Sequence, residues 1–157
     1  MDATRIHLFI THLPVFGIFL GSLVLVFGLI RKESQVKIVS YAIVVISIVG
    51  GIIAFQTGEE AEHAVESIAG LSENAIEEHE ESAELAVWFI YSLGLLSLLA
   101  MYFELKGKPL AKQCSYVVLA VSVITFYFVA STASLGGKIR HDEIGKEQPV
   151  QNDEQDE

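Results

Sequence analysis

The sequence predicts an all-α protein, an up-down bundle of four transmembrane helices, and its composition and charge pattern carry that prediction. Of the 157 residues, 52% are hydrophobic, which makes the chain too apolar for an ordinary soluble domain of this length. Charged residues avoid four windows, at roughly 6–30, 38–58, 85–103 and 113–137. Each window has about 20 residues or more, enough to cross a hydrocarbon core as a helix. Strands this long and without an alternating pattern could not close a barrel.

The first window, 6–30, is expected to be a span rather than a cleaved signal peptide. It is longer than the apolar region of a signal peptide, only Arg5 precedes it as a basic residue, and no A-x-A-like site comes before charge returns. The lone Cys114 excludes an internal disulfide. We expect it to be a small apolar residue near the start of the fourth helix.

The basic residues predict the orientation of the bundle. The two short connections, 31–37 and 104–112, each carry three Lys or Arg residues. Short basic loops stay in the cytoplasm, so both termini and the middle connection, 59–84, are expected outside. The middle connection has ten glutamates and no Lys or Arg, and the net charge of the chain is −10. This balance disfavours nucleic acid or an anionic lipid surface as a partner. It favours solubility of an exposed face, and it would also suit a basic protein.

The middle connection is expected to be helical rather than a long loop. Its alanines and glutamates favour helix, and only Gly70-Leu71-Ser72 interrupts them, with Ser72 as an N-cap candidate. The second and third helices therefore extend into a hairpin that turns near Gly70. Residues 1–145 form one membrane domain on this interpretation. Residues 146–157 are polar and acidic, and the composition predicts a disordered tail.

Small residues at helical spacing predict which helix faces turn inward, because they let membrane helices approach closely. The second span has Ser40, Ser47, Gly51, Ala54 and Gly58 on one line. The line of the third helix is Ala75, His79, Ala83, Ala86, Ile90, Gly94 and Ser97, and that of the fourth is Ala130, Ser134, Gly137 and His141.

All five histidines fall on the outer side of this arrangement. Counting about 1.5 Å per residue places His7, His63, His79 and His141 at similar heights, with His12 lower in the outer leaflet. His79 lies on the apolar stripe of a glutamate-rich helix. His7 and His12 are about 140° apart on an ideal helix, so both can face one point only if the helix starts or bends near Pro14.

Converging imidazoles in a bundle mouth indicate a binding site, since buried polar groups need partners. Neutral imidazole binds iron, zinc or copper, and haem b held by histidines between helices is the commonest such arrangement in membranes. Spacing alone does not choose between haem and a bare ion. His79 is the first candidate ligand, with His7, by its height, or His12, by its burial, as partner and His141 next. A peripheral metal patch of His63, Glu59, Glu60 and Glu66 is the alternative, as is a polar cluster without a cofactor. His63 points away from the stripe and is expected to be dispensable for the main site.

Three short motifs resemble a family of small prokaryotic membrane proteins known only as a domain of unknown function. They are His7-x4-His12-x-Pro14, with Leu8 in place of the family's first proline, the Thr57-Gly58 pair, and the Gly136-Gly137 segment with His141 after it. The family is similar in layout to four-helix b-type cytochromes. The resemblance implies a location in the prokaryotic plasma membrane and, through that layout, a haem. Cytochromes that carry electrons across a membrane on two haems have ligands near both faces, whereas this chain has histidines near one.

The leading functional hypothesis is therefore an electron-transfer subunit with one haem, exchanging electrons with quinol or an extracytoplasmic redox protein. The alternatives are a metal-binding or sensory membrane protein and a structural subunit, in a homo- or hetero-oligomer, that docks through its acidic hairpin. The sequence has no nucleophile beside a base, no phosphate-binding glycine loop and no GxSxG elbow. A binding or electron-transfer role is thus favoured over catalysis by the chain alone.

Overall fold

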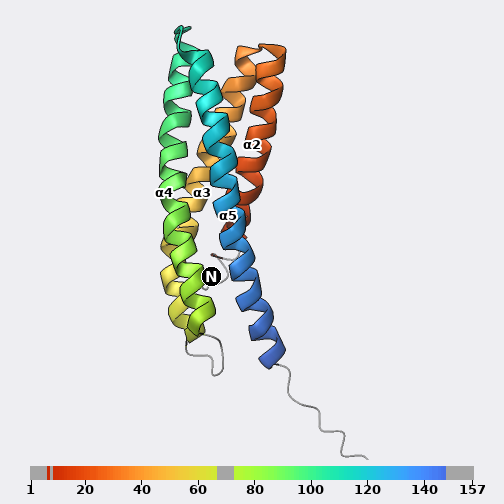
Figure 1. Ribbon diagram of the computed structural model, residues 1–157, viewed down its shortest axis with the longest axis vertical. Helices are drawn as coiled ribbons and strands as arrows, with labels where there is room; N and C mark the ends of the chain where they lie inside the picture. The colour runs from red at the N-terminus through yellow and green to blue at the C-terminus, as the bar shows by residue number, and fades with distance from the viewer. Residues whose placement is uncertain (1–6, 8, 67–72, 148–157) are drawn as a thin grey trace, which may run out of the picture.

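The computed structural model describes residues 7, 9–66 and 73–147, and within these ranges it is entirely helical, with no strand. Four long helices follow one another: α2 (His12–Arg31), α3 (Ser34–Glu66), α4 (Glu73–Leu105) and α5 (Ala111–Glu147). They run up and down side by side as an elongated bundle (Figure 1). The predicted all-α four-helix bundle is confirmed.

Each of the four helices is long and apolar enough to cross a membrane. The surface of the bundle is correspondingly apolar, because large hydrophobic side chains on every helix point away from the core, among them Phe16, Phe27, Ile46, Leu95, Leu98 and Val123. In water such a surface would be unfavourable, whereas lipid tails cover it at no cost. The chain is therefore a multi-pass membrane protein by the length and composition of its helices.

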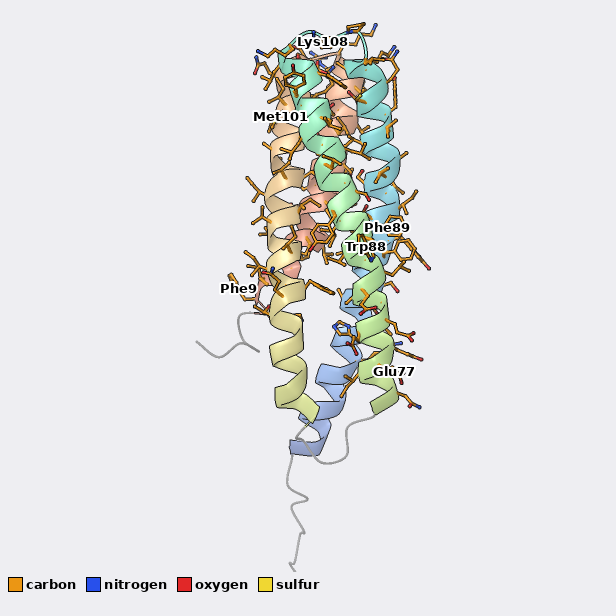
Figure 2. The ribbon with its side chains drawn as sticks, turned by 90° about the vertical axis from the view of Figure 1, so that its left-hand side faces the viewer. Phe9, Glu77, Trp88, Phe89, Met101 and Lys108 are labelled. Carbon is orange, nitrogen blue, oxygen red and sulfur yellow. The ribbon has the colours of Figure 1, made fainter. Side chains whose placement is uncertain are left out.

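The two ends of the bundle differ in charge. The end that carries the two tight connections, after Arg31 and after Leu105, is called the basic end here. The other end, where α3 finishes and α4 begins, is called the acidic end. Figure 2 shows Lys108 at the basic end and Glu77 near the acidic end, with Trp88 and Phe89 between them on α4. Lys32 and Gly107 adopt left-handed backbone angles, which reverse the chain within a few residues and make consecutive helices antiparallel neighbours.

The extended hairpin is present in the helices that form it. α3 continues eight residues past Gly58, the end of its apolar span, to Glu66, and α4 starts at Glu73. The expected turn near Gly70, with its N-cap Ser72, lies outside the described residues, as do residues 148–157 of the expected disordered tail. α5 itself continues through Gly136-Gly137 to Glu147, two residues past the expected domain end.

The core combines close helix approaches with buried hydroxyl groups. Ile18, Leu25, Leu93 and Val118 are fully buried, and the small-residue lines predicted for the second and third spans do face inward, at Ser40, Ser47, Gly51, Ala54, Ala86, Ile90, Gly94 and Ser97. Hydroxyl pairs link helices across the interior. Tyr41 Oη lies 2.7 Å from Ser115 Oγ, and Ser22 Oγ donates to Ser122 Oγ at 2.9 Å.

The inward line predicted for the fourth helix is wrong. Ser134 and Gly137 are exposed, and the buried residues of α5 are instead Ala111, Ser115, Val118, Ser122, Thr125 and Val129. Neighbouring positions on a helix are about 100° apart, so choosing a line one or two positions away turns the assigned face away from the core. The hydroxyl groups of Ser115, Ser122 and Thr125, rather than the positions of Ser134 and Gly137, mark its packed face.

Candidate functional site

His7 lies on a helical turn that precedes α2. The backbone N–H of Thr11 donates to the His7 carbonyl at 3.0 Å, and α2 begins at His12 with Thr11 as its N-cap residue. Pro14 follows in the first turn of α2, where a missing N–H costs no intrahelical hydrogen bond. Thr11 has right-handed helical backbone angles, and its hydrogen bond to His7 is the i to i−4 bond of an α-helix. His7 and His12 face different surroundings.

The imidazole of His7 is held against α3. Its Nδ1 lies 2.8 Å from the carbonyl oxygen of Ala54 and 3.4 Å from Thr57 Oγ1. Because a carbonyl oxygen only accepts, the hydrogen bond requires the proton on Nδ1. The neutral ring then keeps an unprotonated Nε2 with a lone pair. The ring also lies over Gly58, where an added Cβ would be 3.5 Å from Cε1.

The surroundings of His7 favour its neutral form. Partial burial lowers the pKa of His7 below its ordinary value of 6.5, because the charged imidazolium would lose hydration. The hydrogen bond to the Ala54 carbonyl acts in the opposite direction and is the weaker effect. At neutral pH His7 is therefore an uncharged imidazole with one nitrogen donating to the backbone.

The imidazole of His79 is held against α5 in the same manner. Its Nδ1 donates to the carbonyl oxygen of Thr132 at 3.1 Å. The ring lies over Gly136, where an added Cβ would be 3.1 Å from Cε1. The hydroxyl groups of Ser82 and Thr132 are 2.6 Å apart and tie α4 to α5 beside the ring. His79 too is half-buried, with Nδ1 committed to a carbonyl and Nε2 the remaining nitrogen.

The structure brings His7 and His79 together, one from each half of the chain. His7 packs against α3 and His79 against α5, both at the acidic end of the bundle. The exposed surface of α4 changes from acidic, at Glu81 and Glu84, to apolar, at Leu85 and Trp88. His79 lies on the acidic side of this change, between one and two helical turns from Leu85. The pair is therefore near a membrane boundary rather than at mid-bilayer.

The other predicted ligands lie elsewhere or beyond the description. His12 is exposed, and its ring stacks on Phe16 with centroids 6.4 Å apart. His63 and His141 belong to α3 and α5, but their side chains, like those of Glu59, Glu60 and Glu66, lie outside the described residues. Among the side chains that are described, no three His, Cys, Asp or Glu residues gather as a metal site.

Nothing in the sequence marks the groups that hold the two rings. The acceptors are backbone carbonyls of Ala54 and Thr132, which no residue type announces. Gly58 lies on the predicted inward line of the second span and Gly136 in a family-like motif, yet neither position by itself predicts contact with a histidine. A glycine at the level of a histidine on the neighbouring helix is the signal that could have linked them.

A second polar site, also missed, lies at the basic end. Lys37 Nζ is 2.6 Å from Glu104 Oε1, and Ser34 Oγ donates to the same oxygen at 2.8 Å. Both charged side chains are largely buried, at 12% and 8% exposure. The ion pair connects α3 to α4 where the bundle meets its basic connections. Glu104 Oε2 has no hydrogen-bond partner among the described residues.

Comparison of the chain with protein-family models, with curated proteins and with solved structures finds no match.

Proposed function

We propose that the chain is a membrane-embedded electron-transfer subunit that binds one haem b through Nε2 of His7 and of His79. The observation that carries the proposal is that each Nδ1 is hydrogen-bonded to a backbone carbonyl, at Ala54 and at Thr132. Histidines that bind metals commonly donate their other nitrogen in this way, which fixes the tautomer and the ring orientation. Two imidazoles held alike, one from each half of the chain, would bind the haem iron through their Nε2 atoms.

The protonation state of His7 supports the same proposal. An imidazole must be unprotonated at the ligating nitrogen, and burial of His7 lowers its pKa and favours that form. Haem supplies one-electron chemistry when bound. The chain itself contributes the placement of the two rings and their neutral form. Its apolar helices also keep water away from the side of the site that faces the membrane.

The position of the pair defines the partners that we propose. The imidazoles lie near the membrane boundary at the acidic end, within reach of a quinol in the bilayer or of a redox protein outside it. The exposed glutamates on α4 at this level, Glu77, Glu78, Glu80, Glu81 and Glu84, would favour a basic protein partner. A single site at one end does not provide a route for electrons across the whole membrane.

The orientation is part of the proposal and rests on the charges of the connections. With Arg31, Lys32, Lys106 and Lys108 at one end, we propose that the basic end is cytoplasmic and the acidic end faces outward in a prokaryotic plasma membrane. Labelling of intact cells tests this in a Cys114→Ser background. A membrane-impermeant maleimide should modify Ser72→Cys and spare Glu33→Cys. The reverse pattern would contradict the orientation.

The cofactor is tested by the visible spectrum of the purified protein. We expect the absorbance of a haem with two histidine ligands in the wild type, and its loss in His7→Ala and in His79→Ala. His12→Ala and His63→Ala are the matched controls, and both should keep the spectrum. The haem proposal fails if the wild type, expressed with sufficient haem, shows no such absorbance or if His79→Ala retains it.

Metal analysis of the same samples separates the other functions. A result of zinc, copper or non-haem iron bound in a 1:1 ratio and lost in His79→Ala would favour a metal-ion site over a haem site. The further ligands of that ion would then be sought among His63, His141 and Glu66. If the protein binds neither haem nor a metal ion, the remaining function is that of a structural subunit.

A further inference from the structure

The two halves of the chain place their histidine and their glycine at matching heights. His7 is 24 residues before Arg31, the end of α2 (31 − 7), and His79 is 26 before Leu105, the end of α4 (105 − 79). Gly58 is 24 residues after the start of α3 (58 − 34), and Gly136 is 25 after the start of α5 (136 − 111). Both hairpins therefore carry the same pair at the acidic end, the histidine before the turn and the glycine after it.

The contacts within each pair are also the same. Each Nδ1 bonds a carbonyl, of Ala54 or of Thr132, and each ring lies over the glycine four residues later, Gly58 or Gly136. On a helix, residues i and i+4 lie one above the other, and the Cβ of residue i+4 points back towards residue i. A side chain at i+4 would therefore cover the carbonyl of residue i. Glycine leaves that carbonyl open to an imidazole from the neighbouring helix.

The sequences that follow the two histidines support a common origin. Shifted by 72 residues (79 − 7), LPVFGIF at 13–19 aligns with LAVWFIY at 85–91. Leucine, valine and isoleucine recur at equivalent positions, and Phe16 and Phe19 correspond to Trp88 and Tyr91. With the shift of 78 that aligns the glycines (136 − 58), VIS at 45–47 matches VIT at 123–125. The two hairpins run in the same direction, as repeats related by an axis along the bundle do.

We infer that the chain is a duplicated helical hairpin, that His7 and His79 are equivalent residues on either side of the axis between the copies, and that Gly58 and Gly136 are positioning residues for the two rings. This inference rests on the proposed function for its ligand, a metal centre held by two equivalent Nε2 atoms. Binding sites in proteins built from repeats commonly lie at the interface of the repeats.

The two glycines differ in how tightly they pack, and this sets the variants. A Cβ at Gly136 would come within 3.1 Å of the His79 ring, so the ring must move in Gly136→Ala. A Cβ at Gly58 would make an ordinary contact of 3.5 Å, so a larger side chain, as in Gly58→Val, is needed to displace His7. Gly137 has no atom within 4 Å of the added Cβ, so Gly137→Ala is the matched control.

The experiment is ¹⁵N NMR of the imidazoles in the full chain, labelled at histidine and reconstituted in lipid nanodiscs without a cofactor. Signals are assigned with His7→Gln and His79→Gln. At pH 8 we expect both rings in the tautomer with the proton on Nδ1. Gly136→Ala should shift the His79 signals alone, Gly58→Val the His7 signals alone, and Gly137→Ala neither. If Gly136→Ala does not fold by circular dichroism, the Gly58→Val result decides.

Two results would overturn the inference, namely rings with the proton on Nε2, or a shift of His79 in Gly137→Ala as large as in Gly136→Ala. Neither result depends on whether the wild type binds haem, which the visible spectrum decides separately. If the wild type binds haem, Gly136→Ala should also alter the visible spectrum of the bound haem, whereas Gly137→Ala should leave that spectrum unchanged.

Discussion

The basic and acidic ends of the apolar bundle both carry partly buried polar side chains, but these side chains are paired in two different ways. At the basic end, opposite charges form an ion pair. Lys37 Nζ and Ser34 Oγ both contact one carboxylate oxygen of Glu104, Oε1. At the acidic end, His7 and His79 each use Nδ1 to bond a backbone carbonyl, so that Nε2 is the nitrogen left without a proton. In the first arrangement the two charges pair with each other and hold α3 against α4. The second keeps a lone pair on each ring, which is what a ligand site requires.

The largest effect should come from removing one partner of the ion pair. Glu104→Ala leaves the buried ammonium of Lys37 without its carboxylate, which typically costs about 3 kcal/mol in the free energy of unfolding. Unfolding in a titration of mixed micelles with denaturing detergent measures it. The control is Glu84→Ala on the exposed face of the same helix, expected to change stability by less than about 0.5 kcal/mol.

A double variant sharpens this expectation. Replacing Lys37 and Glu104 together by methionine removes both charges and keeps apolar volume, so most of the lost stability should return. If Glu104→Ala were no less stable than Glu84→Ala, the basic end would not be held by the ion pair, and the contrast between the two ends would fail.

The second effect concerns ligand binding, which should stabilise the acidic end selectively. Haem present at 100 times its dissociation constant would add about 2.7 kcal/mol to a protein that binds it only when folded. In hydrogen exchange of the wild type, amides near Ala54 and His79 should become more protected, with smaller changes near Tyr41. His79→Ala with added haem is the control. Equal protection of both ends that persists in His79→Ala would place the ligand elsewhere.

A smaller effect should appear with pH. Burial lowers the pKa of His7 in the folded protein, so the unfolded chain, with an ordinary pKa near 6.5, takes up the proton first. The stability from neutral His7 is therefore complete above about pH 6.5. It falls as the pH drops below that value towards the lowered pKa of the folded state. Unfolding of wild type and of His7→Gln between pH 8 and pH 5 measures the difference. The prediction fails if the two curves stay parallel.

The smallest effect should come from the hydroxyl contact beside His79. Ser82→Ala removes the 2.6 Å contact with Thr132 and should cost about 1 kcal/mol, the usual net value of one hydrogen bond. Ser92→Ala is the matched control, since Ser92 is exposed and its hydroxyl donates only within its own helix, to Trp88. Equal stability of the two variants would show that the hydroxyl pair does not fix α4 to α5.

The histidines show how much of the candidate site can be predicted from the sequence. Their common height at one end follows from counting residues along helices of known rise, and His79 stands out as an imidazole on an apolar stripe. The sequence left His7 and His12 as alternatives because their facing depends on where the helix begins. The structure places His7 inward, against α3, and leaves His12 exposed, as their separation of about 140° on a helix allows.

What the sequence by itself determined is the set of four helices, their order and the two ends with opposite charge. Long uncharged windows and short basic connections suffice for this, because a backbone in lipid must satisfy its own hydrogen bonds and does so as helix. The small-residue lines also indicated the inward faces of the second and third spans, but only the tertiary structure decided which face of α5 turns inward. On α5 that face carries Ser122 and Thr125 rather than Ser134 and Gly137. The physical reason is that a step of one residue rotates a side chain by about 100°, so facing is settled by packing against neighbours, as are the carbonyls of Ala54 and Thr132 that receive the two imidazoles.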